Sequence, residues 1–286
     1  MKTFKTNITS IYGNKGKAWL SALPKLVEEI SLKWELSDLQ EVSNLSYNYV
    51  LSGFQEAQPI ILKLSLDEGG LRQEADTLRA FSDFGGVSVL EEQANALLLK
   101  RAIPGTSLKD SFSKGDQRAI HIACQVAQKL HQAPMPQKSF PHIREWLKAL
   151  DHSPEFIAAR TTPDNRNHIV IYLAKARYLR DKLLQNASEA VLLHGDLHPE
   201  NILQNGEDWV VIDPKGVIGP PIHEVWAFIM NFETDAPFVA DFFAFDLQEL
   251  REWYFVHVIL ALCWSIEDGT SLNPFLGLAK KVYPLV

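Results

Sequence analysis

The sequence is poor in cysteine and in long apolar runs. Its only cysteines, Cys124 and Cys263, are too few for a disulfide framework and have no C-x-x-C spacing for zinc, so we expect both to be reduced core side chains. No stretch reaches the roughly 18 uninterrupted apolar residues that a membrane span needs. The first 19 residues also lack the apolar segment of a secretory signal. These absences predict a cytoplasmic protein with no membrane partner.

Positive charge is scarce as well. Lysine and arginine number 28 against 35 acidic residues, a formal charge of −7. This is the wrong sign for a protein that neutralises nucleic-acid phosphates, so we expect no nucleic-acid partner and a small-molecule partner that is neutral or cationic. With 46% apolar residues, the chain is able to form a real core, and its 286 residues predict two packed lobes rather than one. Nothing in the composition fixes the oligomeric state.

Residues 1–102 predict a small α+β lobe. Short apolar runs separated by polar breakers indicate antiparallel strands, and two stretches have helical spacing. We expect helices over 19–30 and 67–84, and strands over 36–42, 49–54, 59–65, 87–91 and 96–100. The segment after residue 102 carries Pro104 and Gly105, which are typical of a connector, so we predict the hinge between the lobes there.

Residues 103–286 predict a larger, mainly helical lobe. Apolar residues recur with the 3.6-residue period over 116–132, 142–150, 164–186, 222–232, 236–245 and 247–267. One insertion interrupts the helices, with apolar runs at 191–194, 202–204 and 209–213. Asn205-Gly206 lies between the last two runs and favours a tight turn, which predicts a small hairpin whose ends carry polar residues.

Three oxygen-bearing residues lie at the ends of this hairpin. Asp196 and Asn201 are five residues apart, and Asp213 closes the following strand. Phosphoryl transfer needs a carboxylate that orients and deprotonates the attacking hydroxyl, and hard oxygen ligands for Mg²⁺. Asp196 suits the first role, and Asn201 and Asp213 suit the second. The alternative is that they only cap a loop and end a strand, but their joint pattern favours the chemical interpretation.

The first lobe offers an independent indication. Strand alternation in residues 59–65 places Lys63 on one face with Ile61, away from the more apolar face. In the next helix Glu74 lies on the apolar stripe, where an unpaired carboxylate is costly. A pair between Lys63 and Glu74 would satisfy both and direct the ammonium at nucleotide phosphates. The alternative is a snorkelling lysine and a glutamate at the edge of a helix.

These residues resemble the aminoglycoside phosphotransferases, in particular the branch of streptomycin 6-kinases and hydroxyurea phosphotransferases. The matching words are Leu-His-Gly-Asp-Leu-His-Pro-Glu-Asn-Ile-Leu at 193–203, Val-Ile-Asp-Pro-Lys-Gly at 211–216 and Leu-Lys-Arg-Ala-Ile-Pro-Gly-Thr-Ser at 99–107. The resemblance implies a two-lobed, protein-kinase-like α+β fold: an antiparallel-sheet lobe with one main helix, and a helical lobe with the catalytic hairpin.

The resemblance also implies roles for individual residues. Asp196 would be the catalytic base, with His194 as a structural brace of its loop. ATP would bind between the lobes with Mg²⁺ on Asn201 and Asp213, and the implied nucleotide-site residues are Lys63, Glu74, Arg101 and Ala102. We expect no catalytic role for the loop residues His198 and Glu200.

The implied reaction is transfer of the γ-phosphate of ATP to a hydroxyl of a streptomycin-type antibiotic. A metabolic kinase of an amino alcohol or a sugar is the alternative enzyme. A nucleotide-binding pseudokinase is a second alternative, but the complete set of site residues argues against it.

Two departures from protein kinases limit the acceptor. No glycine lies between Val42 and Val50, so a glycine-rich phosphate cover is absent. Ser43, Asn44 and Ser46 of this segment either contact phosphates or are solvent-facing turn residues. The chain has Asp-Pro-Lys-Gly at 213–216 where protein kinases have Asp-Phe-Gly, and it lacks an activation loop. We therefore expect a small-molecule acceptor rather than a protein.

Acidic residues are concentrated in the second lobe. Residues 220–269 hold nine acidic side chains against a single basic one, which would attract an ammonium or guanidinium group. The candidate substrate-binding residues are Glu224, Asp235, Glu267 and Asp268. The alternative is that these carboxylates are the solvated faces of amphipathic helices.

Overall fold

The computed structural model describes residues 1–286 except 44, 114, 153 and 187–188. The chain forms two compact units. The N-terminal unit contains Met1–Ser111 and Glu200–Lys215, and the C-terminal unit contains Phe112–Pro199 and Gly216–Val286. This division differs from a boundary at residue 102, because the strand that follows the predicted hinge pairs with the hairpin at residues 202–211 and keeps both in the N-terminal unit.

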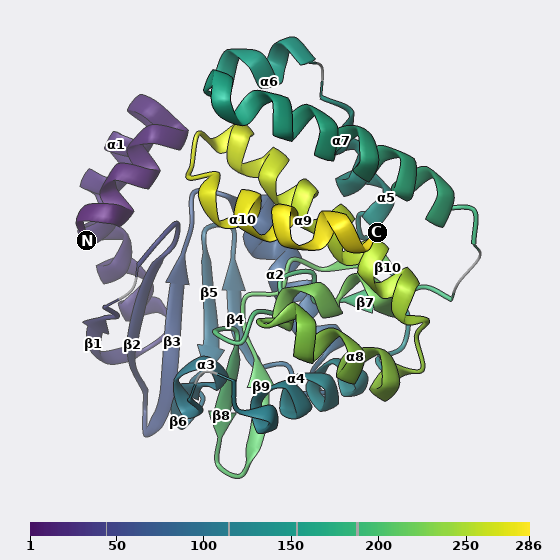
Figure 1. Ribbon diagram of the computed structural model, residues 1–286. Helices are drawn as coiled ribbons and strands as arrows, with labels where there is room; N and C mark the ends of the chain where they lie inside the picture. The colour runs from purple at the N-terminus through teal and green to yellow at the C-terminus, as the bar shows by residue number, and fades with distance from the viewer. Residues whose placement is uncertain (44, 114, 153, 187–188) are drawn as a thin grey trace. The chain divides into compact units, whose positions relative to one another are not determined.

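A five-stranded antiparallel sheet forms the centre of the N-terminal unit (Figure 1). Its strand order is β1-β2-β3-β5-β4. The strands are β1 (Leu36–Glu41), β2 (Tyr49–Gln55), β3 (Gln58–Leu64), β4 (Val89–Gln93) and β5 (Ala96–Lys100). All five match the predicted runs to within a few residues, because alternating apolar side chains and polar breakers are local signals.

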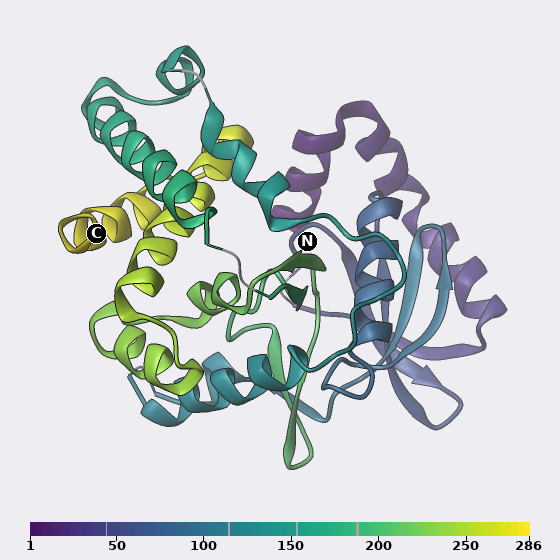
Figure 2. The same cartoon turned by 90° about the vertical axis from the view of Figure 1, so that its right-hand side faces the viewer.

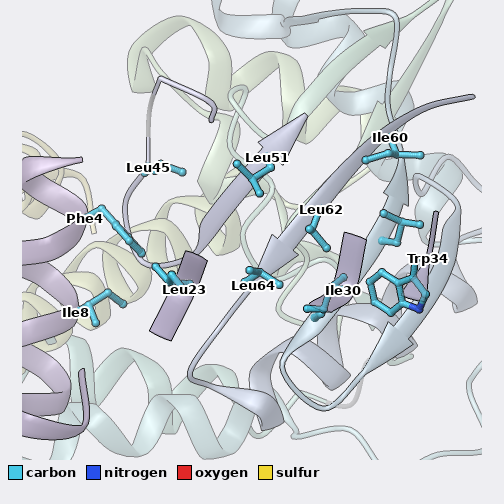
Figure 3. Packing of buried hydrophobic residues seen from close by; sticks show 12 residues of the cluster. Phe4, Ile8, Leu23, Ile30, Trp34, Leu45, Leu51, Ile60, Leu62 and Leu64 are labelled. Carbon is cyan, nitrogen blue, oxygen red and sulfur yellow. The ribbon is translucent and has the colours of Figure 1, made fainter. Parts of the chain in front are cut away.

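Helix α1 (Lys2–Lys33) covers one face of this sheet. Phe4 and Ile8 are fully buried in a cluster with Ile60 and other sheet residues (Figure 3). The prediction placed a helix over 19–30 only, and the observed helix begins 17 residues earlier. Gly13 interrupts it with a φ of +56°, which glycine adopts readily. A Cβ on Gly16 would lie 2.5 Å from the carbonyl oxygen of Ile8, so the helical segments before and after Gly13 approach closely.

Helix α2 (Glu68–Ala80) packs on the other face of the sheet. The carboxylate of Asp67 accepts the N–H of Gly70 at 2.9 Å and caps the helix. Leu71, Ala75 and Leu78 form its buried stripe against strand residues that include Leu97. This helix ends four residues before the predicted end at residue 84.

A second, three-stranded sheet completes the N-terminal unit. Strand β6 (Pro104–Ser107) pairs with β8 (Ile202–Asn205), which pairs with β9 (Asp208–Val211), and the short α3 (Leu108–Ser111) follows β6. The predicted hairpin therefore forms, with Gly206 at a φ of +65° in its turn. Residues 104–107, which the sequence predicts to be part of a connector, instead form an edge strand that pairs with the hairpin.

The C-terminal unit is mainly helical (Figure 2). Helix α7 packs against α9, and most of α9 is buried. The α-helices are α4 (Gln117–Leu130), α5 (Ile143–Trp146), α6 (Pro154–Arg160), α7 (Pro163–Leu183), α8 (Phe232–Phe243), α9 (Leu247–Asp268) and α10 (Asn273–Val282). Strands β7 (Val191–Leu193) and β10 (Val217–Gly219) pair antiparallel beside them. Short 3₁₀ helices are η1 (Leu147–Asp151), η2 (Pro221–His223), η3 (Val225–Phe228) and η4 (Tyr283–Leu285). Within the described residues, no helix is both long enough and apolar enough to span a bilayer.

The helix predicted over 222–232 was wrong. The segment instead forms η2 and η3 and then becomes extended at Ile229. The carboxylate of Asp235 accepts the N–H groups of Met230 and Asn231 at 3.0 and 2.7 Å. These N–H groups are thus satisfied at the start of α8, which explains why one continuous helix does not run through this region.

Candidate active site

The N-terminal unit holds a buried ammonium between two carboxylates. Nζ of Lys63 on β3 donates to Oε2 of Glu74 on α2 at 2.6 Å and to Oδ1 of Asp213 at 2.9 Å. Lys63 and Glu74 are 4% and 6% exposed. Strand alternation puts Lys63 on the face that α2 covers, and helical spacing turns Glu74 towards it. The structure therefore brings the predicted pair together and adds Asp213 as a third member.

This triad combines one ammonium with two carboxylates. Burial lowers the pKa of Lys63, but the Asp213 and Glu74 carboxylates raise it by more, so the pKa lies above its ordinary value and the amine stays charged. Burial raises the pKa of Glu74, which Lys63 opposes. Within the described part of the chain, Oε1 of Glu74 is buried without a hydrogen-bond partner. Two carboxylates thus contact the Lys63 ammonium, and Lys215 is a second positive charge that acts on Glu74.

Asn201 and Asp213 lie at the same end of the β8–β9 hairpin. The N–H of Ile212 donates to the carbonyl of Asn201 at 3.1 Å, which extends the ladder by one pair to the residue before Asp213. Asp213 has a φ of +58°, a left-handed conformation that aspartate tolerates better than most residues. Its side chain is 43% exposed although it contacts Lys63.

These residues fit Mg²⁺. Their side chains offer one amide oxygen and one carboxylate, the hard donors that this ion takes from a protein when phosphates and waters supply the others. Gln73 of α2 donates to the carbonyl of Lys215 at 2.5 Å and so ties the segment after Asp213 to the helix.

The predicted hinge residues follow β5. The N–H of Arg101 donates to the carbonyl of Pro59 at 3.1 Å, and the Arg101 residue is exposed. Ala102 is 7% exposed, and its backbone N–H and carbonyl have no hydrogen bond to any other described residue. Asn205 accepts the N–H of Ile103 at 3.2 Å and fixes the chain just beyond them.

In the C-terminal unit, a buried carboxylate supports the loop that carries Asp196. Oε2 of Glu224 accepts the N–H of His194 at 2.6 Å, and Oε1 accepts the N–H of Gly195 at 2.9 Å. Nδ1 of His194 accepts the N–H of Asp196 at 3.2 Å. His194 is fully buried and contacts the loop through this hydrogen bond, while Nε2 of His131 lies 3.8 Å from Glu224.

Asp196 makes a direct contact with a histidine of the same loop. Nε2 of His198 lies 2.9 Å from Oδ1 of Asp196, and the two side chains are 45% and 31% exposed. The N–H of His198 also donates to the carbonyl of Asp196 at 2.8 Å. The expectation that His198 is an ordinary loop residue did not foresee this contact. Glu200, in the N-terminal unit, pairs with Lys109.

Behind the loop lie two buried histidines. Nδ1 of His223 and Nε2 of His257 are 2.9 Å apart, and Trp226 stacks on His257 at 5.4 Å between ring centres. Burial lowers the pKa of His257 to about 3 and that of His223 well below its ordinary range, so both are neutral near pH 7. They line a cavity of about 10 Å³ with Gly195, room for roughly one water molecule.

The four predicted substrate carboxylates separate into two groups. Glu224 and Asp235 are 1% and 7% exposed, and their oxygens accept backbone N–H groups. The expectation that these two face an acceptor was wrong, because each carboxylate stabilises the chain around it. Glu267 pairs with Nε2 of His152 at 2.5 Å and is 37% exposed, and Asp268 is exposed at the end of α9.

Sequence reasoning missed three contacts: Asp213 with Lys63, Glu224 with the loop, and His198 with Asp196. Only His198 had a local signal, since it lies two residues after Asp196 and the Pro199 that follows restricts its backbone. Of Ser43, Asn44 and Ser46, for which phosphate contact and a solvent-facing turn were the two alternatives, Asn44 lies outside the described residues.

Comparison with known proteins gives a family match over most of the chain. The family of aminoglycoside/hydroxyurea antibiotic resistance kinases matches residues 33–269. A streptomycin 6-kinase of Streptomyces glaucescens is 24% identical and covers 92% of this chain and 90% of its own length. A streptomycin 3''-kinase of Klebsiella pneumoniae is 27% identical over 83% of this chain and 91% of its own length.

A solved structure agrees with the fold. The crystal structure of aminoglycoside phosphotransferase APH(4)-Ia has a TM-score of 0.72 at 15% identity and covers 92% of this chain and 99% of that protein. At this identity the likeness concerns the fold alone. The predicted α+β, protein-kinase-like fold is confirmed.

Proposed function

This chain belongs to the aminoglycoside/hydroxyurea antibiotic resistance kinase family and is an ATP-dependent phosphotransferase, and we propose that its acceptor is a hydroxyl of a streptomycin-type aminoglycoside. The two streptomycin kinases named above support this substrate class. The excess of acidic over basic residues in 220–269 also supports a cationic acceptor, because negative charge attracts ammonium and guanidinium groups.

Residues of the N-terminal unit bind the nucleotide in this proposal. Lys63 contacts the α- and β-phosphates while Glu74 holds its ammonium in place, and the backbone of Arg101 and Ala102 binds the base. Asn201 and Asp213 would hold Mg²⁺, which when bound neutralises charge that develops on the phosphates.

Residues of the C-terminal unit act on the acceptor. Asp196 accepts a hydrogen bond from the acceptor hydroxyl, orients its oxygen towards the γ-phosphorus and takes its proton as the new bond forms. Glu224 and His194 hold the backbone of the loop so that this carboxylate is placed before the acceptor arrives.

The observation that carries the proposal is the Lys63 ammonium, buried and held by Glu74 and Asp213. Burying the charges of Lys63 and Glu74 is costly, and removing one partner from such a pair is more costly still. A phosphate-binding role accounts for an arrangement that stability alone does not favour.

The test is an ADP-release assay over a panel of acceptors, with ³¹P NMR of the product. We expect streptomycin to be phosphorylated, and hydroxyurea, choline and amino sugars to be poorer acceptors. Asp196→Asn is the matched control: it should abolish transfer and leave ATP binding unchanged. If choline or a neutral sugar is phosphorylated in preference to streptomycin, the metabolic-kinase alternative replaces the proposal. ATP binding without ADP release for any acceptor would favour a pseudokinase.

A further inference from the structure

His198 occupies a defined position beside the proposed catalytic base. Its Nε2 is 2.9 Å from Oδ1 of Asp196, and its own backbone N–H returns to the Asp196 carbonyl at 2.8 Å. Leu197 between them is fully buried and anchors the turn. With Pro199 next in the chain, the backbone of His198 has little freedom. The imidazole is therefore held over the carboxylate by the loop itself.

A column of aromatic rings supports the imidazole from behind. The Trp226 indole meets the His198 ring edge to face, with 6.3 Å between centres and 74° between planes. Trp226 in turn stacks on His257 at 3° between planes, and His257 is hydrogen-bonded to His223. These last two imidazoles are buried, so the column begins in the packed interior of the C-terminal unit. An ordinary half-exposed surface histidine has no such support.

We propose that His198 is a positioning residue for phosphoryl transfer: its Nε2–H donates to Oδ1 of Asp196 and assigns Oδ2 to the acceptor hydroxyl. This inference rests on the proposed function of Asp196. The hydroxyl oxygen forms a bond to the γ-phosphorus, the bond from that phosphorus to the bridging oxygen breaks, and its electron pair leaves with ADP. The hydroxyl proton goes to Oδ2, and His198 keeps its own proton throughout.

Fixing one carboxylate oxygen matters because transfer depends on the direction of attack. A displacement of about 1 Å at a reacting group costs on the order of 100-fold in rate. The imidazole restrains rotation of the Asp196 carboxylate about χ2, a torsion with a broad energy profile, and His198→Ala removes this restraint. The loss should appear in kcat and leave the KM for ATP unchanged, since Lys63 and Asp213 bind the nucleotide in the other unit.

Two substitutions separate positioning from packing. His198→Ala removes the donor, and we expect kcat to fall on the order of 10- to 100-fold. His198→Gln restores an N–H at a reach similar to that of Nε2, so we expect kcat within about threefold of wild type. The matched control is His168→Gln, an exposed histidine of α7 in the same unit, which should leave kcat unchanged.

A second measurement does not depend on the acceptor. In protein labelled with ¹⁵N-histidine, the Nε2 signal of His198 is assigned by its loss in His198→Gln. We expect that signal to move in Asp196→Ala and to stay in place in His168→Gln. If it stays in place in Asp196→Ala, the hydrogen bond is absent and the proposal for His198 is overturned.

The kinetic outcomes distinguish the two proposals. Equal kcat for wild type and His198→Ala overturns the role of His198, even when streptomycin is phosphorylated. A loss in His198→Gln as large as in His198→Ala shows that the ring only packs, which also overturns it. If no acceptor in the panel is phosphorylated, the proposed function fails, and the NMR comparison still decides whether His198 donates to Asp196.

Discussion

The two buried histidines make the C-terminal unit sensitive to acid. Burial lowers the pKa of His257 from 6.5 to about 3. The unfolded chain therefore binds a proton at this residue over a pH range in which the folded chain does not. The stabilisation is complete above pH 6.5 and is lost as the pH falls. The full difference corresponds to about 5 kcal/mol, at about 1.4 kcal/mol for each pH unit.

The perturbation that isolates this effect is His257→Gln. Glutamine keeps a polar atom near Nε2, within reach of His223, but it does not titrate in this range. Between pH 7 and pH 5, His257 alone should cost the wild type about 2 kcal/mol of unfolding free energy. The variant starts less stable at pH 7, since the packing against Trp226 is altered, but it should lose about 2 kcal/mol less than the wild type on acidification.

Urea unfolding at several pH values, followed by tryptophan fluorescence, measures the difference. Trp226 stacks on His257, and Trp253 lies 4.2 Å from His223 between ring centres, so both report on this unit. His168→Gln is the control and should retain the pH dependence of the wild type. If wild type and His257→Gln lose stability in parallel between pH 7 and pH 5, the argument from burial is refuted.

Three further predictions concern the site. Lys63→Met should weaken ATP binding at least tenfold by calorimetry, and Asp213→Asn should remove the dependence of that binding on Mg²⁺; unchanged affinity in both would contradict the nucleotide site. Glu224→Gln places an amide N–H against a backbone donor, so kcat should fall 10- to 100-fold with ATP affinity intact. For a cationic acceptor, KM should rise with salt, and less so in a Glu267→Gln, Asp268→Asn double variant; no salt dependence would count against charge steering.

Periodicity predicted the Lys63–Glu74 pair because the faces of a strand and a helix are set locally. The lysine lies on the α2 face of β3 and the glutamate on the buried stripe of α2 because of local periodicity, which does not depend on the rest of the fold. Asp213 was predicted as a metal ligand but not as a partner of Lys63. Its left-handed backbone turns the side chain in a direction that no pattern of apolar residues encodes.

Longer-range contacts explain the errors in the fold. The segment at 104–107 has the proline and glycine of a connector, yet it becomes a strand because β8 offers an edge about 100 residues later in the sequence. The helix expected over 222–232 had suitable spacing. Two prolines at its start and the capping of Met230 and Asn231 by Asp235 favour short 3₁₀ turns instead.

Counting charges identified an acidic region but not what each carboxylate touches. Glu224 and Asp235 already accept backbone N–H groups, and breaking such hydrogen bonds in a buried site costs roughly 1–3 kcal/mol for each group left unpaired. A cationic acceptor therefore gains little from approaching them. Glu267 and Asp268 retain contact with solvent. Of the four predicted carboxylates, these two are therefore the ones from which a salt-sensitive attraction is expected. The four predicted residues thus divide into buried carboxylates that accept backbone N–H groups and exposed carboxylates, and only burial and hydrogen bonding distinguish the two kinds.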